Sequence, residues 1–170
     1  MGQEIERKWL VNGEAWKTLA SGGSFIRQGY LSLGGEDSNE VRVRIERHGD
    51  QTRACLTIKS QGGLVREENE ISLPLAQAEQ LIDLRQGTLI EKMRWRVVTD
   101  TGHTIEVDEY MGELAGLVVA ECEFATVDDA FNVPDFLGEE ITEALHGYRN
   151  ADLARHGHPG KHKRSNTPTP

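Results

Sequence analysis

Long apolar runs, signal-peptide features and phosphate-binding loops are all missing from this sequence of 170 residues. A transmembrane helix needs about 20 consecutive apolar residues, and no stretch approaches that length. The N-terminus carries acids in place of the apolar core of a signal peptide, so we expect a cytoplasmic protein without a membrane partner. No Gly-x-x-x-x-Gly-Lys-Ser/Thr motif occurs, which excludes the P-loop class of nucleotide-binding proteins.

Cysteine is scarce as well, with only Cys55 and Cys122 present. Both lie in runs that alternate like strands, and counting in twos places Cys55 on the same face as Lys59. The same counting places Cys122 opposite Glu121 and Glu123, and therefore on the other side of a sheet. We expect no disulfide between them, only two small buried side chains.

Basic residues are outnumbered, because 28 acids leave a net charge of −9. Such an acidic protein does not favour nucleic acid as a general partner. Residues 156–170 are an exception, since they contain lysine and arginine but no acid, and their composition predicts a disordered basic tail. Residues 1–155 have the size of one domain with a sizeable core.

Alternation of apolar and polar residues dominates the chain and predicts strands. We expect eight of them, near residues 3–10, 25–33, 40–48, 52–60, 64–73, 91–99, 103–110 and 116–125. Short turn sequences such as His48-Gly49-Asp50 join several of these runs and indicate antiparallel hairpins. Other segments predict helices over 12–20, 74–84, 134–145 and 150–154.

One face of each predicted strand is charged or polar, and the opposite face is apolar. For a single strand, a plain sheet with one solvated face is the simpler interpretation. Eight strands with short turns, however, tend to close on themselves and remove their edges. We therefore predict a mainly β, α+β fold: a closed eight-stranded antiparallel β-barrel, or tunnel, with helices packed outside and charges inside. The inward set is Glu4, Glu6, Lys8, Gln28, Tyr30, Arg42, Arg44, Glu46, Thr57, Lys59, Arg66, Glu68, Glu70, Lys92, Arg94, Arg96, Glu106, Asp108, Glu121 and Glu123.

Charges of both signs in one lumen need partners, because unpaired buried charges are costly. A polyphosphate bound with divalent cations uses both signs: lysine and arginine neutralise phosphate oxygens, and carboxylates bind hard cations such as Mg²⁺ or Mn²⁺. A Glu-x-Glu spacing places two carboxylates about 7 Å apart on one side of a strand. This spacing occurs at Glu4/Glu6, Glu68/Glu70 and Glu121/Glu123.

The motifs form an ordered series along the chain. They are Glu4-Ile5-Glu6-Arg7-Lys8, Val-Arg-Val-Arg (41–44), Leu-Thr-Ile-Lys (56–59), Arg-Glu-Glu-Asn-Glu (66–70), Glu-Lys-Met-Arg (91–94), Glu-Val-Asp-Glu-Tyr (106–110) and Ala-Glu-Cys-Glu-Phe (120–124). Together they resemble the CYTH superfamily, also called triphosphate tunnel metalloenzymes, and in particular its bacterial inorganic tripolyphosphatase group. The resemblance covers roughly residues 1–155.

This resemblance implies roles for individual residues. It implies that the metal ligands are Glu4, Glu6, Glu121 and Glu123, with Glu70 and Asp108 as further acidic positions. The first four of these residues are also expected to be catalytic. It implies that the phosphate-binding residues are Lys8, Arg42, Arg44, Lys59, Lys92 and Arg94. We add Tyr30 to this set because it faces inward. Lys8 completes the catalytic set as a phosphate ligand rather than a base, because two neighbouring glutamates should raise its pKa.

The expected reaction is in-line attack of water on a terminal phosphoryl group, with Mg²⁺ or Mn²⁺ as cofactor. The family includes enzymes for inorganic tripolyphosphate, thiamine triphosphate and nucleotides, and class IV adenylate cyclases. Trp9 and Trp95 fall on the outer face, so Tyr30 is the one aromatic residue that clearly faces the lumen. Inorganic tripolyphosphate, hydrolysed to pyrophosphate and phosphate, is therefore the favoured small-molecule partner. The other activities, a binding module without turnover and a homodimer stay open.

Overall fold

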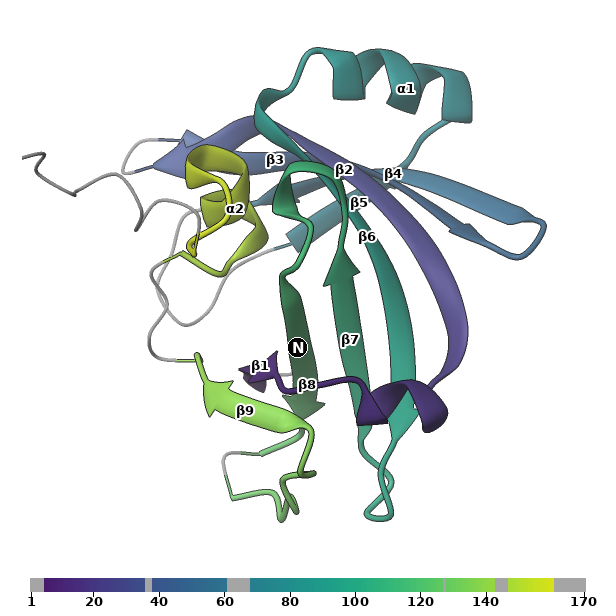
Figure 1. The fold of residues 1–170 in the computed structure, drawn as a ribbon. Coiled ribbons are helices and arrows are strands. Elements are labelled where there is room, and N and C mark those ends of the chain that lie inside the picture. Colours follow the sequence, from purple (N-terminus) through teal and green to yellow (C-terminus); the bar gives the residue numbers. More distant parts are fainter. Residues whose placement is uncertain (1–4, 36–37, 61–67, 127, 143–146, 161–170) are drawn as a thin grey trace, which may run out of the picture.

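The computed structural model describes residues 5–35, 38–60, 68–126, 128–142 and 147–160, and its centre is a curved antiparallel sheet (Figure 1). The strands are β1 (Ile5–Val11), β2 (Ser21–Gly35), β3 (Ser38–His48), β4 (Gln51–Lys59), β5 (Glu68–Ser72), β6 (Gln86–Val98), β7 (Thr104–Tyr110), β8 (Val118–Phe124) and β9 (Leu137–Glu140). The helices are α1 (Leu75–Asp83), α2 (Asn150–His156) and the 3-10 helices η1 (Ala15–Thr18) and η2 (Gly112–Leu114). The strand order is β5-β4-β3-β2-β6-β7-β8-β1-β9.

The sheet confirms the mainly β, antiparallel class and corrects the predicted number of strands, while the predicted closure into a barrel stays a prediction. It has nine strands, and β5 and β9 form its two edges. Within the described part of the chain these edges do not pair with each other, so hydrogen bonds do not close the sheet. Its curvature nevertheless gives it a concave inner face and a convex outer face (Figure 1).

The ninth strand, β9, lies where we predicted a helix over 134–145, and that prediction is wrong. β9 pairs with β1, with Trp9 opposite Glu140. The edge of β1 would otherwise present unpaired N–H and C=O groups, and this pairing outweighs the local helical pattern. Gly138 allows the close approach, because a Cβ there would lie 2.7 Å from Oδ1 of Asn12.

The other helices follow the sequence pattern with shorter or shifted bounds. α1 begins directly after Pro74 and α2 begins at Asn150, as expected. The helix predicted over 12–20 is reduced to η1, which buries Trp16. β2 and β6 begin earlier than predicted because they pair from Ser21↔Arg96 to Tyr30↔Gln86. No helix in the described part is long and apolar enough to span a membrane.

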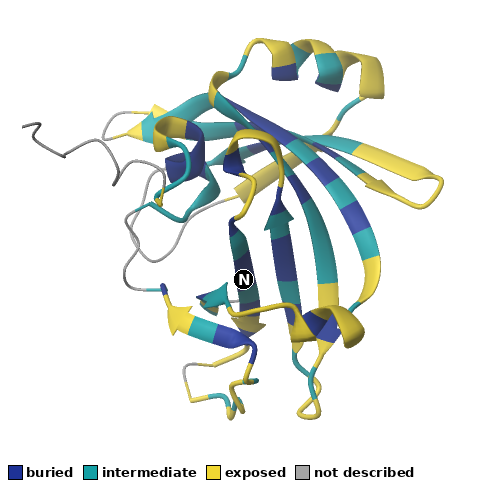
Figure 2. Cartoon of the chain, viewed as in Figure 1, coloured by how far each residue is buried: buried dark blue, intermediate teal, exposed yellow. Residues whose placement is uncertain are grey.

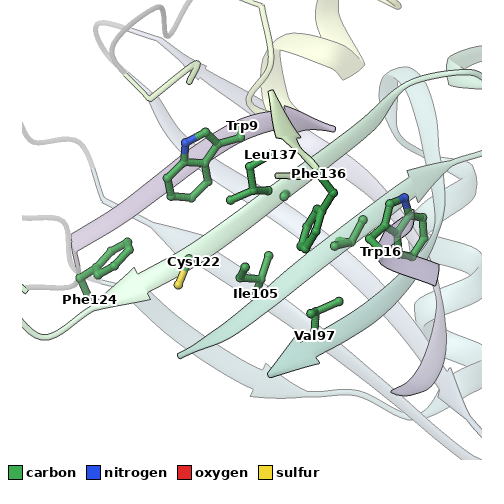
Figure 3. Close-up of a cluster of buried hydrophobic side chains, with 10 residues drawn as sticks. Trp9, Trp16, Val97, Ile105, Cys122, Phe124, Phe136 and Leu137 are labelled. Atoms are coloured by element: carbon green, nitrogen blue, oxygen red, sulfur yellow. The ribbon is translucent and has the colours of Figure 1, made fainter. Parts of the chain in front are cut away.

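The outer face is apolar and is buried under two groups of side chains. The first extends across β1, β6, β7 and β8 and includes Trp9, Trp16, Val97, Ile105, Phe124 and Phe136 (Figure 3). The second lies under α1, where Ala78 and Ile82 pack with Val43 and Ile45. Cys122 belongs to the first group, whereas Cys55 is opposed to Arg44 on the inner face, and both thiols are free. Burial of this apolar area is the main stabilising contribution of these contacts.

α2 packs on the inner side of the sheet, which corrects the prediction that the helices lie outside. Leu153 and Ala151 of α2 pack with Tyr30, Ile90 and Tyr110. These strand residues share their face with the charged side chains but lie at one end of it, where the face is apolar. An apolar surface of this kind needs a covering element, and α2 supplies one. The charged part of the inner face begins beyond this apolar end.

Candidate functional site

The strand register brings the polar and charged inner residues together on one face, which we call the charged face. Residues directly opposed in an antiparallel pair point to the same side of the sheet. The opposed pairs include Glu6↔Glu123, Lys8↔Glu121, Glu106↔Glu121, Arg94↔Asp108, Gln28↔Arg44, Tyr30↔Arg42, Arg42↔Thr57, Thr57↔Glu70 and Lys59↔Glu68. Glu4, a predicted metal ligand, and Arg66 lie outside the described residues. Burial varies along these strands, from buried central positions to exposed ends (Figure 2).

β3, β4 and β5 form the basic side of the charged face around Arg42. Its Nη2 donates to Oγ1 of Thr57 at 3.3 Å and lies 3.8 Å from a carboxylate oxygen of Glu68. Lys59 contacts the same carboxylate at 3.1 Å. Arg42 is only 8% exposed, yet its Nε finds no acceptor among the residues that the structure describes. A buried donor of this kind is costly, so an incoming acceptor oxygen would be stabilising.

Arg44 is the next inward residue of β3 and is half-buried. Its Nε donates to Oε1 of Gln28 at 3.0 Å. Burial and the neighbouring guanidinium groups of Arg42 and Arg94 lower the pKa of Arg44 from its ordinary value. Cations that crowd together in this way favour the binding of an anion. Gln28 holds Arg44 in place, and the prediction did not include it among the site residues although its inward position was readable from the alternation.

β6 and β7 contribute a buried ion cluster at the centre of the charged face. Lys92 and Asp108 are both fully buried, with Nζ of Lys92 2.5 Å from Oδ2 of Asp108. Arg94 donates to the same carboxylate through Nε at 2.7 Å and Nη2 at 2.8 Å. Burial lowers the pKa of Lys92 to about 8, although the Asp108 carboxylate opposes this shift. Burial alone would favour neutral Asp108, but Lys92 and Arg94 hold its pKa well below the ordinary range.

β1 and β8 form the acidic side of the charged face around Lys8. Nζ of Lys8 lies 2.9 Å from Glu6 and 3.0 Å from Glu121. Burial acts against protonation, but these two carboxylates outweigh it and raise the pKa of Lys8. The pKa of Glu121 is lowered, because Lys8 outweighs the effect of its burial. Lys8 is therefore a cation, as the neighbouring glutamates predicted, and is not poised as a base.

Arg94 connects the central cluster to the acidic side. Its Nη2 lies 3.4 Å from Glu121, and its Nη1 also pairs with Glu106. Glu106 was not among the predicted site residues, although the alternation placed it on this face. Together the contacts form one network from Lys92 to Glu6, in which Arg94 and Lys8 each bridge carboxylates.

The carboxylates of the acidic side have the donor chemistry of a site for a hard divalent cation. Glu6, Glu121 and Glu123 offer oxygen ligands, and neither histidine nor cysteine competes on this side. Within the described residues no group of three or more potential ligands is already drawn together. Glu6 and Glu123 are exposed and directly opposed, so their carboxylates face solvent from adjacent strands.

Two predicted site residues, Tyr30 and Glu70, differ strongly in exposure. Tyr30 is 1% exposed, packs in the apolar group under α2, and accepts a 3.4 Å hydrogen bond from Gln28. Burial raises the pKa of its phenol above the ordinary value. Glu70 is exposed on the edge strand β5, opposite Thr57. The structure therefore provides no exposed stacking surface at Tyr30.

Comparison with known proteins extends over nearly the whole chain. The model of a family described as the CYTH domain matches residues 2–155. A curated relative from Acetivibrio thermocellus, named inorganic triphosphatase, is 37% identical over 157 residues that cover 91% of this chain and 95% of the relative. A second relative of that name, from Nitrosomonas europaea, is 36% identical over 157 residues and covers 89% and 96%. The crystal structure of an inorganic triphosphatase is similar with a TM-score of 0.66 and 35% identity, covering 91% of this chain and 95% of that one.

Proposed function

Because the chain belongs to the CYTH family, we propose that it is a metal-dependent inorganic triphosphatase that converts tripolyphosphate and water to pyrophosphate and phosphate. Two relatives that are 37% and 36% identical over 157 residues carry the name inorganic triphosphatase. The observation that carries the proposal is the charged face itself, on which cations from β3, β4 and β6 share one side of the sheet with carboxylates from β1 and β8. One buried donor, Nε of Arg42, still lacks an acceptor among the described residues.

The basic side binds the phosphate chain in this proposal. Arg42, Arg44 and Lys59 offer donors from adjacent strands, and a polyanion relieves the repulsion between the crowded guanidinium groups. Lys92 and Arg94 contribute further positive charge at the centre, and Lys8 contributes it at the acidic side. These fixed cations stabilise the charge that develops on the phosphoryl oxygens during transfer.

The acidic side holds Mg²⁺ or Mn²⁺ in this proposal. Glu6, Glu121 and Glu123, together with the predicted ligand Glu4, would supply the oxygen ligands that such cations prefer. When bound, the metal neutralises phosphate charge and lowers the pKa of a coordinated water. Lys8 competes for the carboxylates of Glu6 and Glu121, and we propose that it turns to a phosphate oxygen in the complex.

Asp108 has a different role from the exposed carboxylates. We predicted it as a further metal position, but both of its oxygens already accept from Lys92 and Arg94 in a fully buried setting. We therefore propose that Asp108 orients these two cations toward the phosphate chain. Glu70 keeps its proposed acidic role, from the exposed edge strand β5.

In the proposed reaction a water oxygen attacks the terminal phosphorus as the bridging P–O bond opposite it breaks. Pyrophosphate leaves with the bridging oxygen, and the attacking water gives one of its protons to bulk solvent. Protonated Lys8 cannot accept that proton, so this residue binds phosphate and does not activate water. The fixed cluster of Lys92, Arg94 and Asp108 reduces the reorganisation needed as charge moves.

The choice of inorganic tripolyphosphate over an organic triphosphate rests on Tyr30. A base or thiazole ring would gain from an exposed aromatic surface, whereas Tyr30 is buried in the apolar group under α2. The test is kcat/KM for tripolyphosphate, ATP and thiamine triphosphate with Mg²⁺ and with Mn²⁺. Preferred hydrolysis of tripolyphosphate supports the proposal. Cyclic AMP formation from ATP, or metal-dependent binding without phosphate release, would replace it with a cyclase or a binding module.

We also propose that the two sheet edges enclose the triphosphate, as a tunnel. The charged face continues to β5 on one side and to β1 beside β9 on the other, so enclosure would bring both sets of charges onto one ligand. Spin labels at the exposed Asn69 of β5 and Glu139 of β9 test this arrangement. A short, narrow distance distribution with Mg²⁺ and tripolyphosphate supports a tunnel, and a long, broad one contradicts it.

A further inference from the structure

β1 places three consecutive residues on alternating sides of the sheet. Glu6 and Lys8 lie on the charged face, and Arg7 between them lies on the outer face, opposite Cys122. The guanidinium carbon of Arg7 stands 4.9 Å from the ring centre of Trp9 and 5.6 Å from that of Phe124. Because Arg7 is joined through the backbone to Glu6 and Lys8, a movement of the Arg7 backbone also moves these two residues of the proposed site.

β1 is supported unevenly by its two neighbours. β8 pairs with it from Ile5 to Leu10, whereas the register of β9 covers only Trp9 and Val11. The backbone of Lys8 lies where β9 ends: N of Ile141 donates to its carbonyl oxygen at 2.8 Å. From this point toward the N-terminus, β9 gives β1 no further register partner among the described residues.

At this point the side chain of Thr142 supplies a hydrogen bond to the backbone of β1. N of Lys8 donates to Oγ1 of Thr142 at 2.9 Å, and the same hydroxyl donates to Oε1 of Glu140 at 2.9 Å. Glu140 in turn receives a forked pair of hydrogen bonds from Arg7, with Nε at 2.8 Å and Nη2 at 2.7 Å. A fork of this kind fixes orientation as well as distance.

We propose that Arg7, Glu140 and Thr142 form an outer clamp that positions Glu6 and Lys8 for metal and phosphate binding. The chain of contacts runs from the backbone of Lys8 through the Thr142 hydroxyl and the Glu140 carboxylate to Arg7. It thus joins the two residues of β1 that follow Glu6 to one carboxylate on the far side of the sheet. The clamp residues are positioning residues, since they lie on the face opposite to the substrate. The inference rests on the function proposed above and adds a support on that opposite face.

Glu79 offers a matched control for the clamp. It forms a 2.8 Å ion pair with Arg27, and its side chain is 47% exposed, compared with 2.7 Å and 39% for Glu140 with Arg7. Glu79→Gln and Glu140→Gln therefore remove equivalent surface charges, but only the second touches β1. Thr142→Val removes the hydroxyl with little change of shape, and Thr142→Ser restores the hydroxyl.

The experiment measures Mn²⁺ binding by isothermal titration calorimetry without substrate, alongside kcat and KM for tripolyphosphate and the midpoint of thermal unfolding. Residues that support a metal site from outside typically alter affinity or activity by about 10–100-fold. We expect Glu140→Gln and Thr142→Val to weaken Mn²⁺ binding by about tenfold, the lower end of that range, and to raise KM for tripolyphosphate. Glu79→Gln and Thr142→Ser should stay within about twofold of the unmodified protein, well below that range.

The outcomes separate this inference from the proposed function. Unchanged Mn²⁺ binding and KM in Glu140→Gln and Thr142→Val, in an active enzyme, would overturn the clamp alone. An equal loss in Glu79→Gln would overturn it too, because the effect would then follow from surface charge. If the unmodified protein neither binds Mn²⁺ nor releases phosphate, both the proposed function and the clamp are contradicted.

Discussion

Asp108→Asn tests the buried ion cluster at the centre of the charged face. In the folded protein the Asp108 carboxylate accepts one close contact from Lys92 and two from Arg94, all within 2.8 Å. Asparagine has nearly the same shape but no charge, and its amide nitrogen would face donors. Lys92, which is fully buried, would then lack its counter-charge.

The size of the effect follows from this burial. Removing one partner of a buried ion pair costs roughly 3–5 kcal/mol, because the remaining charge stays desolvated. For a chain of this length each kcal/mol lowers the unfolding midpoint by about 2–4 °C, which gives a loss of roughly 6–20 °C. Adding Lys92→Met to Asp108→Asn removes the unmatched ammonium group and should restore at least about 1 kcal/mol of the unfolding free energy.

Urea denaturation followed by circular dichroism measures these free energies, with thermal unfolding as a second assay. Glu79→Gln serves as the exposed control, and its expected cost is about 0.2–1 kcal/mol. A loss for Asp108→Asn within that control range would refute the reasoning. So would a double variant that is less stable than Asp108→Asn alone, because the ammonium group would then not be the source of the penalty.

Three further predictions concern single residues of the site and its covering helix. Glu121→Gln should reduce metal-dependent phosphate release by at least the roughly 10–100-fold seen for residues around a metal. The rate is measured per amount of protein, and thermal unfolding checks that the variant is folded. A near-normal rate of release would contradict the role of Glu121. Because the pKa of Lys92 is about 8, its positive charge is present below that pH and lost above it, so kcat/KM should fall as pH rises through this range. Lys92→Arg should move the decline to higher pH, and an unmoved profile would assign it to another group. Gly87→Ala should destabilise the protein by roughly 1–3 kcal/mol, since a Cβ at φ +70° would lie 2.1 Å from the carbonyl oxygen of Ala154 in α2. Gly102→Ala, with open space around it, should cost less. Equal costs of the two substitutions in urea denaturation would contradict the contact.

The composition of the charged face was predictable from the sequence because the side-chain period of a strand is two. Once Lys8 is placed inward, Glu6 must share its side and Arg7 must lie opposite. The same rule predicted that Trp9 and Trp95 lie outside, and both belong to or pack against the outer apolar group. Alternation is a property of each strand alone, so it needs no knowledge of which strands are neighbours.

The pairing partners were less accessible, because they depend on contacts between distant segments. Ion pairs such as Arg94 with Glu121 required the order of β6, β7 and β8 in the sheet. β9 was missed because a strand of four residues carries too little alternation to outweigh a helical pattern nearby. The placement of α2 was missed because its apolar residues fit either face, and only the apolar end around Tyr30 and Tyr110 decides between them.

The most direct test of the proposed triphosphatase activity is phosphate release from tripolyphosphate by the unmodified protein, with Mg²⁺, with Mn²⁺ and with a chelator. We expect one of the metals to support turnover, the chelator to abolish it, and kcat/KM for tripolyphosphate to exceed the values for ATP and thiamine triphosphate. Turnover that persists in the chelator, or absence of phosphate release from every triphosphate with both metals, would contradict this proposal.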